Sequence, residues 1–267
     1  NLRNATRSNS SISITLLTNI FFGVAMNAAR AVASQVENIV KQFAQNIIVA
    51  INPQITKSYV SGDRNYSYSL VCKACKYSVI IILLFLIPLF FEADVILDLW
   101  LEDVPANAAL FTRLTMIVLL LDLSCSAIST LVLAEGRIKW LYIAISLMHV
   151  LYFFAVWWLF NAGYPAYVAY IAIAVLYLPT DVVKILIATK ECGIPRWQYT
   201  REVVVRVLPV ILLGLIPSAI ISGSMDDGMA RLLLVLAVST AAIAISTYAF
   251  AMTEGERSVI KSKLRRS

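Results

Sequence analysis

One segment of the chain carries a stripe of charged and amide side chains. Between residues 27 and 59, polar residues recur at steps of mostly three, four or seven: Arg30, Ser34, Glu37, Asn38, Lys41, Gln45 and Asn52. This spacing places them on one face of a helix. Cationic side chains bind anions, while amides and hydroxyls form hydrogen bonds with polar ligands or water. The stripe therefore predicts a polar binding surface.

The rest of the sequence is typical of a membrane protein. Hydrophobic residues make up 60% of the chain and charged residues only 14%, which is far from the composition of soluble domains. The apolar runs are about twenty residues long, as needed to cross ~30 Å of hydrocarbon. We predict an all-α integral membrane protein with eight spans near residues 10–26, 27–56, 76–91, 107–133, 138–160, 164–190, 203–222 and 229–252.

The distribution of Lys and Arg predicts the orientation. With both termini in the cytoplasm, all 22 basic residues fall at inner ends except Arg30, Lys41, Arg113 and Arg231, as the positive-inside rule requires. The predicted outer loops are acidic. The net charge of +6 is then explained by topology, and no nucleic-acid partner is expected.

This setting restricts what the polar stripe faces. A charge near the middle of a membrane helix costs at least about 2.5–3.5 kcal/mol, so the stripe must face protein or water. Glu37 and Lys41 are four residues apart and can neutralise each other, which is a purely structural alternative. That pair does not explain a stripe of about six turns, and we predict a hydrated cavity.

Other polar groups lie within predicted spans. Asp122 has no partner on its own helix, so it is the first candidate for coupling to H+ or Na+. Asp181 is a second candidate, although its spacing from Lys184 favours a structural ion pair. We expect His149 to be packed and neutral.

The four cysteines predict neither a metal centre nor redox chemistry. Cys72 and Cys75 have helical spacing, and no second pair completes a zinc site. We expect no cofactor.

The chain divides at the charged, Pro-containing stretch 189–202. We predict a six-helix unit at 1–190, followed at 191–267 by two helices and a basic tail. Residues 61–78 predict a short interfacial helix on the inner face. The chain starts at Asn1, and we expect it to be the later part of a longer protein.

Specific motifs also resemble a known family. The run "NIFFGVAMNAARAVASQVENIVKQFAQNIIVAINPQITKSYVSGD" resembles the seventh and eighth helices of bacterial polysaccharide flippases, which belong to the MATE-like multidrug/oligosaccharidyl-lipid/polysaccharide (MOP) superfamily. The runs "ILDLWLEDVPANAALFTRL" and "AEGRIKW" follow in the family's order, while Ala31 stands where a glycine is common. The resemblance implies a MATE-like second lobe, the counterpart of helices 7–12, with two trailing helices and an N-terminal lobe that is absent here.

The resemblance also implies a function. These flippases are not enzymes; they move polyprenyl-diphosphate-linked oligosaccharide to the outer leaflet of the bacterial inner membrane, for capsule or O-antigen of lipopolysaccharide, by alternating access. Arg30 and Lys41 would bind the diphosphate. Ser34, Gln45 and Asn52 would contact sugar or water.

Three other functions remain open at this point. A drug or cation exporter of the same superfamily would favour acidic and aromatic cavity linings. A membrane glycan polymerase or ligase would need chemistry at an outer loop, where this chain has no histidine. A non-transporting scaffold in an export complex would keep its partners without the stripe.

Overall fold

The apolar runs of the sequence form long helices. A computed structural model describes the backbone of residues 2–264 and the side chains of 17–23, 26–258 and 262. Its helices, two of them short π-helical segments (η), are α1 (Leu2–Val60), α2 (Arg64–Trp100), α3 (Ala108–Ser124), α4 (Ser126–Glu135), α5 (Lys139–Asn161), α6 (Val168–Cys192), α7 (Arg196–Tyr199), η1 (Thr200–Val205), α8 (Arg206–Ser224), α9 (Met229–Ser246), η2 (Thr247–Ala251) and α10 (Glu254–Leu264). These residues contain no strand, and six helical stretches are long and apolar enough to cross a membrane. The chain is therefore an all-helical, multi-pass membrane protein, as the sequence predicts.

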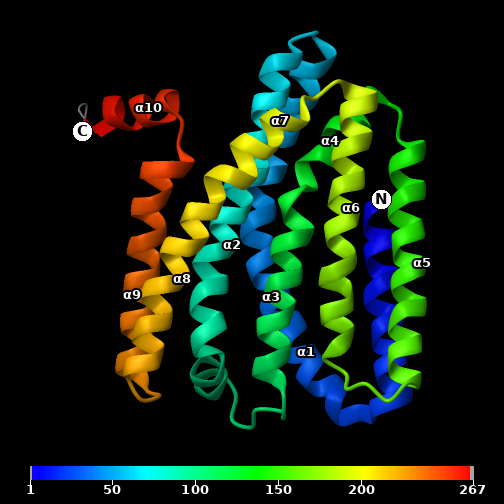
Figure 1. Ribbon diagram of the computed structural model, residues 1–267, viewed down its shortest axis with the longest axis vertical. Helices are drawn as coiled ribbons and strands as arrows, with labels where there is room; N and C mark the ends of the chain where they lie inside the picture. The colour runs from blue at the N-terminus through cyan, green and yellow to red at the C-terminus, as the bar shows by residue number, and fades with distance from the viewer. Residues whose placement is uncertain (1, 265–267) are drawn as a thin grey trace.

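Helix α1 consists of two legs joined at Gly23. This glycine has a φ of 77°, a left-handed conformation that glycine adopts without steric penalty. Figure 1 shows the first leg descending beside α5 and the chain turning back to rise behind α3. Phe22 packs edge-on against Phe160 of α5, with ring centroids 4.8 Å apart. The turn lies within a few residues of the predicted boundary at 26/27.

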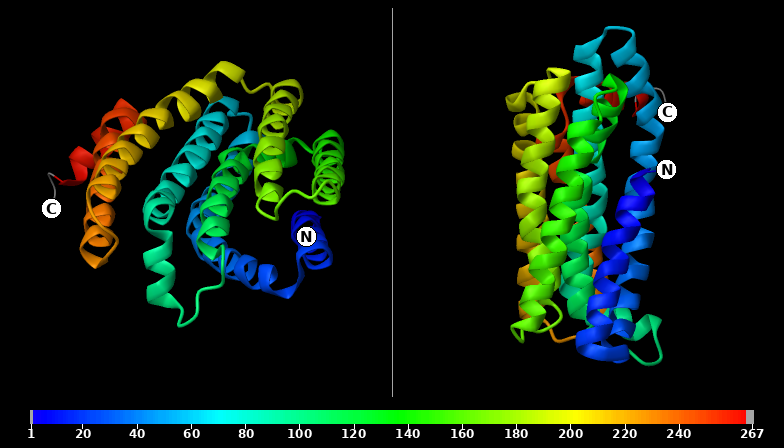
Figure 2. Two further views of the ribbon diagram at one scale, coloured as in Figure 1. Left: turned by 60° about the horizontal axis from the view of Figure 1, so that its bottom comes forward. Right: turned by 90° about the vertical axis from the view of Figure 1, so that its right-hand side faces the viewer.

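Helix α2 is the central element of the bundle. It packs against α1 and α3 on one side and against the trailing pair α8 and α9 on the other, as the end-on view in Figure 2 shows. The prediction of a separate interfacial helix within 61–78 is wrong, because α2 begins at Arg64 and continues without a break through this region. Tyr68, Val71 and Cys75 are buried in a hydrophobic cluster, which draws this segment into the core.

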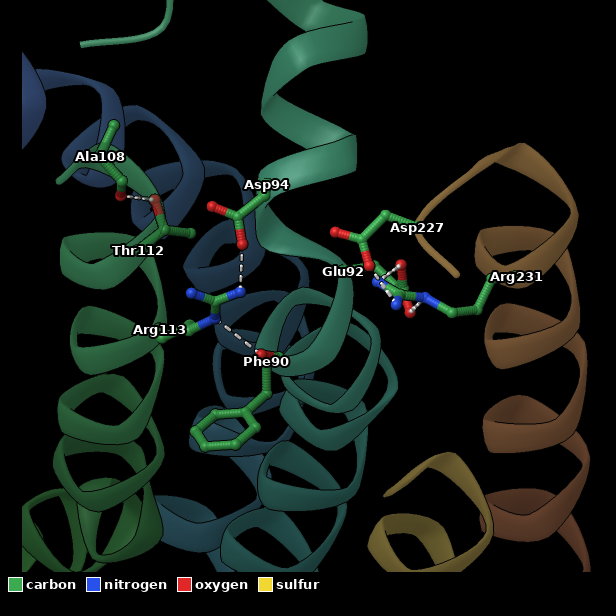
Figure 3. A network of polar contacts seen from close by, with 8 residues as sticks. All are labelled: Phe90, Glu92, Asp94, Ala108, Thr112, Arg113, Asp227 and Arg231. Carbon is green, nitrogen blue, oxygen red and sulfur yellow. Dashed lines mark hydrogen bonds and ion pairs between the residues drawn. The ribbon is translucent and has the colours of Figure 1, made fainter. Parts of the chain in front are cut away.

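A buried charge network joins the trailing pair to α2 (Figure 3). Glu92 has no exposed surface, and it accepts two hydrogen bonds from the Arg231 guanidinium, at 2.9 and 3.0 Å. Arg231 also pairs with Asp227. Nearby, Arg113 of α3 pairs with Asp94. Arg113 and Arg231, two of the basic residues that do not lie at predicted inner ends, therefore tie helices together.

The two ends of the bundle differ in charge. Turns at one end are flanked by basic residues, among them Lys57, Arg64, Arg137, Lys139, Lys190 and Arg196, whereas turns at the other end carry Asp98, Glu102, Asp103, Asp226 and Asp227. The structure therefore has a basic end and an acidic end. The side chains of Arg3, Arg7, Lys261 and Lys263, and all of Arg265 and Arg266, lie outside the described part of the chain.

Candidate functional site

The bundle is interrupted at the junction of α3 and α4. Cys125 leaves the helical conformation there, with φ −111° and ψ 16°. The hydroxyls of Ser124 and Ser126 donate to the carbonyls of Leu121 and Leu123, each at 2.9 Å, which gives the backbone an alternative to helical hydrogen bonds. Irregular backbone within a membrane persists only where protein buries it or where it borders water.

A polar cavity of about 230 Å³ lies beside this break. Helices α1, α3, α4, α5 and α6 surround it, and its polar lining consists of Gln45, Asn52, Asp122, Ser126, Ser129, Tyr142, His149, Tyr177, Thr180 and Lys184. A water molecule occupies about 30 Å³ of liquid, so the cavity has room for several. It is a compartment with polar groups and room for water among apolar helices.

Charged groups of α1 and α3 and a tyrosine of α6 meet at Asp122, which lines the cavity. Lys41 Nζ lies 3.4 Å from Glu37 and 3.8 Å from Asp122. The Tyr177 hydroxyl donates to Asp122 at 3.4 Å. These contacts are long, and the Lys41 and Asp122 side chains keep 20% and 13% of their surface exposed. The cluster is therefore loosely held, and it borders the cavity through Asp122.

A tighter ion pair lies next to this cluster. Lys184 donates to Asp181 at 2.8 Å, and Ser124 donates to the same carboxylate at 3.0 Å. Lys184 also lies over the Tyr177 ring, 5.8 Å from its centroid. The structure therefore contains the pair that the spacing of Asp181 and Lys184 predicts, and the pair reaches the cavity through Lys184.

The structure distributes the predicted stripe over three environments. Gln45 and Asn52 line the cavity, and Asn52 accepts a hydrogen bond from Thr130 at 2.9 Å. Glu37 and Lys41 form a charged cluster with Asp122 behind the cavity lining. Ser34 is half-buried and Asn38 is exposed on the outside of the bundle; neither lines the cavity.

Arg30 does not line the cavity. It lies on the second leg of α1, about two turns after the bend at Gly23. It is 7% exposed and interacts with the hydroxyl of Tyr170. A small pocket of about 30 Å³ joins Tyr152 to His149 and Tyr177 of the cavity wall. That pocket has room for about one water molecule, and its lining is mostly apolar and does not include Arg30.

Sequence reasoning missed several lining residues. Ser126 and Ser129 follow the helix break, and Tyr142 and Tyr177 come from apolar spans in which a single tyrosine is unremarkable. The run "LSCS" at 123–126 was the available signal, because two serines around a cysteine supply competing hydrogen bonds where the helix breaks. His149 was expected to be packed; its Nδ1 lies 2.7 Å from the Ile145 carbonyl, and the ring borders the cavity.

Comparison with known proteins gives no relative: the chain matches no family model, no curated protein and no solved structure.

Proposed function

We propose that this chain is the second lobe of a transporter that moves polyprenyl-diphosphate-linked oligosaccharide across the bacterial inner membrane. The observation that carries the proposal is the cavity with polar lining that lies beside Asp122 and its partner Lys41, among membrane helices. The identity of the transported molecule in this proposal rests on the resemblance of residues 19–63 to polysaccharide flippases. In this proposal both legs of α1 join the six apolar stretches as spans, and the basic end faces the cytoplasm.

The outer surface of α1 supports a missing partner lobe. Gln35, Asn38, Gln42 and Asn46 recur at steps of three and four on the exposed side of this helix. Polar side chains within a membrane face protein or water rather than lipid. The proposed cover is the N-terminal lobe of the same transporter, and the second lobe alone does not flip lipid.

The loose charge cluster supplies a mechanism for binding and release. Lys41 is shared between Glu37 and Asp122, so it has no spare positive charge for an anion while both carboxylates are ionised. Protonation of Asp122 removes one of these partners, so that only Glu37 competes with a phosphate for Lys41. Arg30 provides the second phosphate contact, reached when the lobes rock. Gln45 and Asn52 contact sugar hydroxyls.

A cation exporter is the second candidate, and one observation favours it. The cavity presents Asp122 together with Tyr142 and Tyr177, and aromatic faces beside a carboxylate attract organic cations. This lining is closer to that of an exporter than the stripe alone predicts.

Ligand binding to the purified chain separates the two candidates. We expect polyprenyl diphosphate to bind more tightly than neutral polyprenol, and Lys41→Gln to weaken binding about tenfold. Lys139→Gln, at an exposed position near the basic end, is the matched control and changes nothing. Equal binding of polyprenol and polyprenyl diphosphate contradicts the proposal. Binding of tetraphenylphosphonium that Asp122→Asn abolishes favours the exporter.

A further inference from the structure

A second polar pocket lies near the basic end of the bundle, away from the cavity. It has a volume of about 190 Å³ and is bounded by α2, by the segment that contains α7 and η1, and by the start of α10. Two π-helical segments, η1 and η2, lie close to this junction, and such irregular turns frequently mark functional sites. The transport proposal does not use this pocket.

The two carboxylates of the pocket are already neutralised. Lys76 is 1% exposed; its ammonium donates to Glu256 at 3.1 Å and to the Ala251 carbonyl at 2.8 Å. Glu202 pairs with Arg206 at 3.1 Å. Neither carboxylate therefore carries an uncompensated negative charge into the pocket.

Lys73 is the remaining charged residue that lines this pocket. It is half-buried, and no carboxylate in the described part of the chain lies within ion-pair distance of it. Ser69 stands one helical turn before it on the same face of α2, while Gln198 and Thr253 contribute an amide and a hydroxyl from the other walls. A lysine surrounded by neutral donors is suited to a phosphate oxygen.

The surroundings of the pocket place it at the depth of lipid headgroups. Trp197, next to Gln198, is 70% exposed, and exposed tryptophans gather at the membrane interface. Helix α10 lies across the end of α9 instead of continuing it (Figure 1), as an interfacial helix does. Arg257 of α10 lies over the exposed Tyr248 ring, 5.7 Å from its centroid.

We propose that this pocket binds the phosphate ester of a membrane phospholipid, with Lys73 as the charged contact and Ser69, Gln198 and Thr253 as hydrogen-bonding contacts. The bound lipid would link α2, the start of the trailing pair and α10 at one point. This site is independent of the transport proposal, because it shares no residue with the cavity.

Native mass spectrometry of the delipidated full chain tests the site. We expect one phosphatidylglycerol to be retained at low lipid concentration, while diacylglycerol, which lacks the phosphate, is not retained. Lys73→Gln should weaken retention about five- to tenfold, and Ser69→Ala should weaken it less. Lys190→Gln, an exposed lysine at the same end but outside the pocket, should match the unmodified chain.

The proposal is overturned if Lys73→Gln retains as much phosphatidylglycerol as Lys190→Gln, or if the unmodified chain retains diacylglycerol as well as phosphatidylglycerol. It is also overturned if Ser69→Ala retains as much phosphatidylglycerol as the unmodified chain at every lipid concentration, even where Lys73→Gln does not. Glycerol phosphate serves as the soluble competitor. If it displaces phosphatidylglycerol at similar concentrations, the pocket is a phosphate site filled from solution, which overturns the lipid source. If it does not, the lipid source is supported.

Discussion

Two clusters in the bundle pair a basic side chain with carboxylates under different conditions. At the acidic end, Glu92 is fully buried and accepts two short hydrogen bonds from Arg231. In the middle, Lys41 lies 3.8 Å from Asp122 beside a cavity, and both side chains are partly exposed. Removal of a partner leaves a buried charge uncompensated in the first cluster, whereas water can replace the partner in the second. We therefore interpret the first as a fixed joint and the second as an exchangeable site.

The largest loss of stability should come from breaking the Glu92–Arg231 pair. Glu92→Gln leaves Arg231 with Asp227 as its only carboxylate partner, and we expect the free energy of unfolding to fall by about 3 kcal/mol, the lower end for breaking a buried pair. Thermal unfolding in detergent measures this loss. Asp94→Asn is the control, because the Asp94 side chain is 60% exposed and its pair is worth at most about 1 kcal/mol. Similar losses for both variants would show that Glu92 is no joint.

The apolar part of the same joint should be next in sensitivity. A Cβ added at Gly214 of α8 would lie 2.5 Å from Ile87 Cδ1 and 3.2 Å from Ile243. Gly214→Val should lower the free energy of unfolding by about 1–3 kcal/mol through overpacking. Gly223→Val on the same helix meets no atom within 4 Å and should cost less. If the two substitutions are equivalent, α8 does not pack tightly on α2.

The exchangeable site should tolerate loss of its carboxylate. Asp122→Asn leaves Lys41 paired with Glu37 at 3.4 Å and open to water, so we expect the free energy of unfolding to change by less than about 1 kcal/mol. The same thermal unfolding assay measures it beside Glu92→Gln. A loss as large as that of Glu92→Gln would mean that both clusters are fixed joints.

The smallest effect concerns the attachment of α10 and its pH dependence. Burial alone would raise the pKa of the Glu256 carboxyl, but the backbone N–H of Thr253 and the Lys76 ammonium outweigh it and hold the pKa below 4.5. A depressed pKa stabilises the folded form above 4.5, and this contribution is lost as the pH falls through the lower folded-state value. Hydrogen exchange should therefore show α10 protected at neutral pH and opening only in acid. If the amides of α10 already begin to exchange faster at pH 6, a group other than the Glu256 carboxyl controls the attachment of this helix.

Apolar run length was sufficient to predict most of the fold. The runs at 138–160 and 164–190 correspond closely to α5 and α6, because a helix is the simplest way to satisfy every backbone group in a membrane. The continuity of the first part of α2, from Arg64 into the membrane span, could not be predicted, since its polar beginning resembles a surface helix. Only tertiary contacts show that Tyr68 and Cys75 are buried.

The candidate site could be predicted only in part. Helical periodicity identified the stripe and the Glu37–Lys41 pair, because both depend on a single helix. The contact of Lys41 with Asp122 joins α1 to α3, and no local pattern reveals which helices are neighbours. Periodicity also placed Arg30 and Gln45 on one stripe, yet packing separates them into a buried tyrosine cluster and a wet cavity.

Cysteine accessibility in intact membranes tests the central claim that this cavity is wet. After the four native cysteines are replaced, a small, charged maleimide should label single cysteines at Gln45, Asn52 and Ser129, which line the cavity. It should not label cysteines at Val40, Ala44 or Ile55, which are at most 2% exposed. If positions 45, 52 and 129 are as unreactive as 40, 44 and 55, the cavity is packed structure and the transport proposal loses its support.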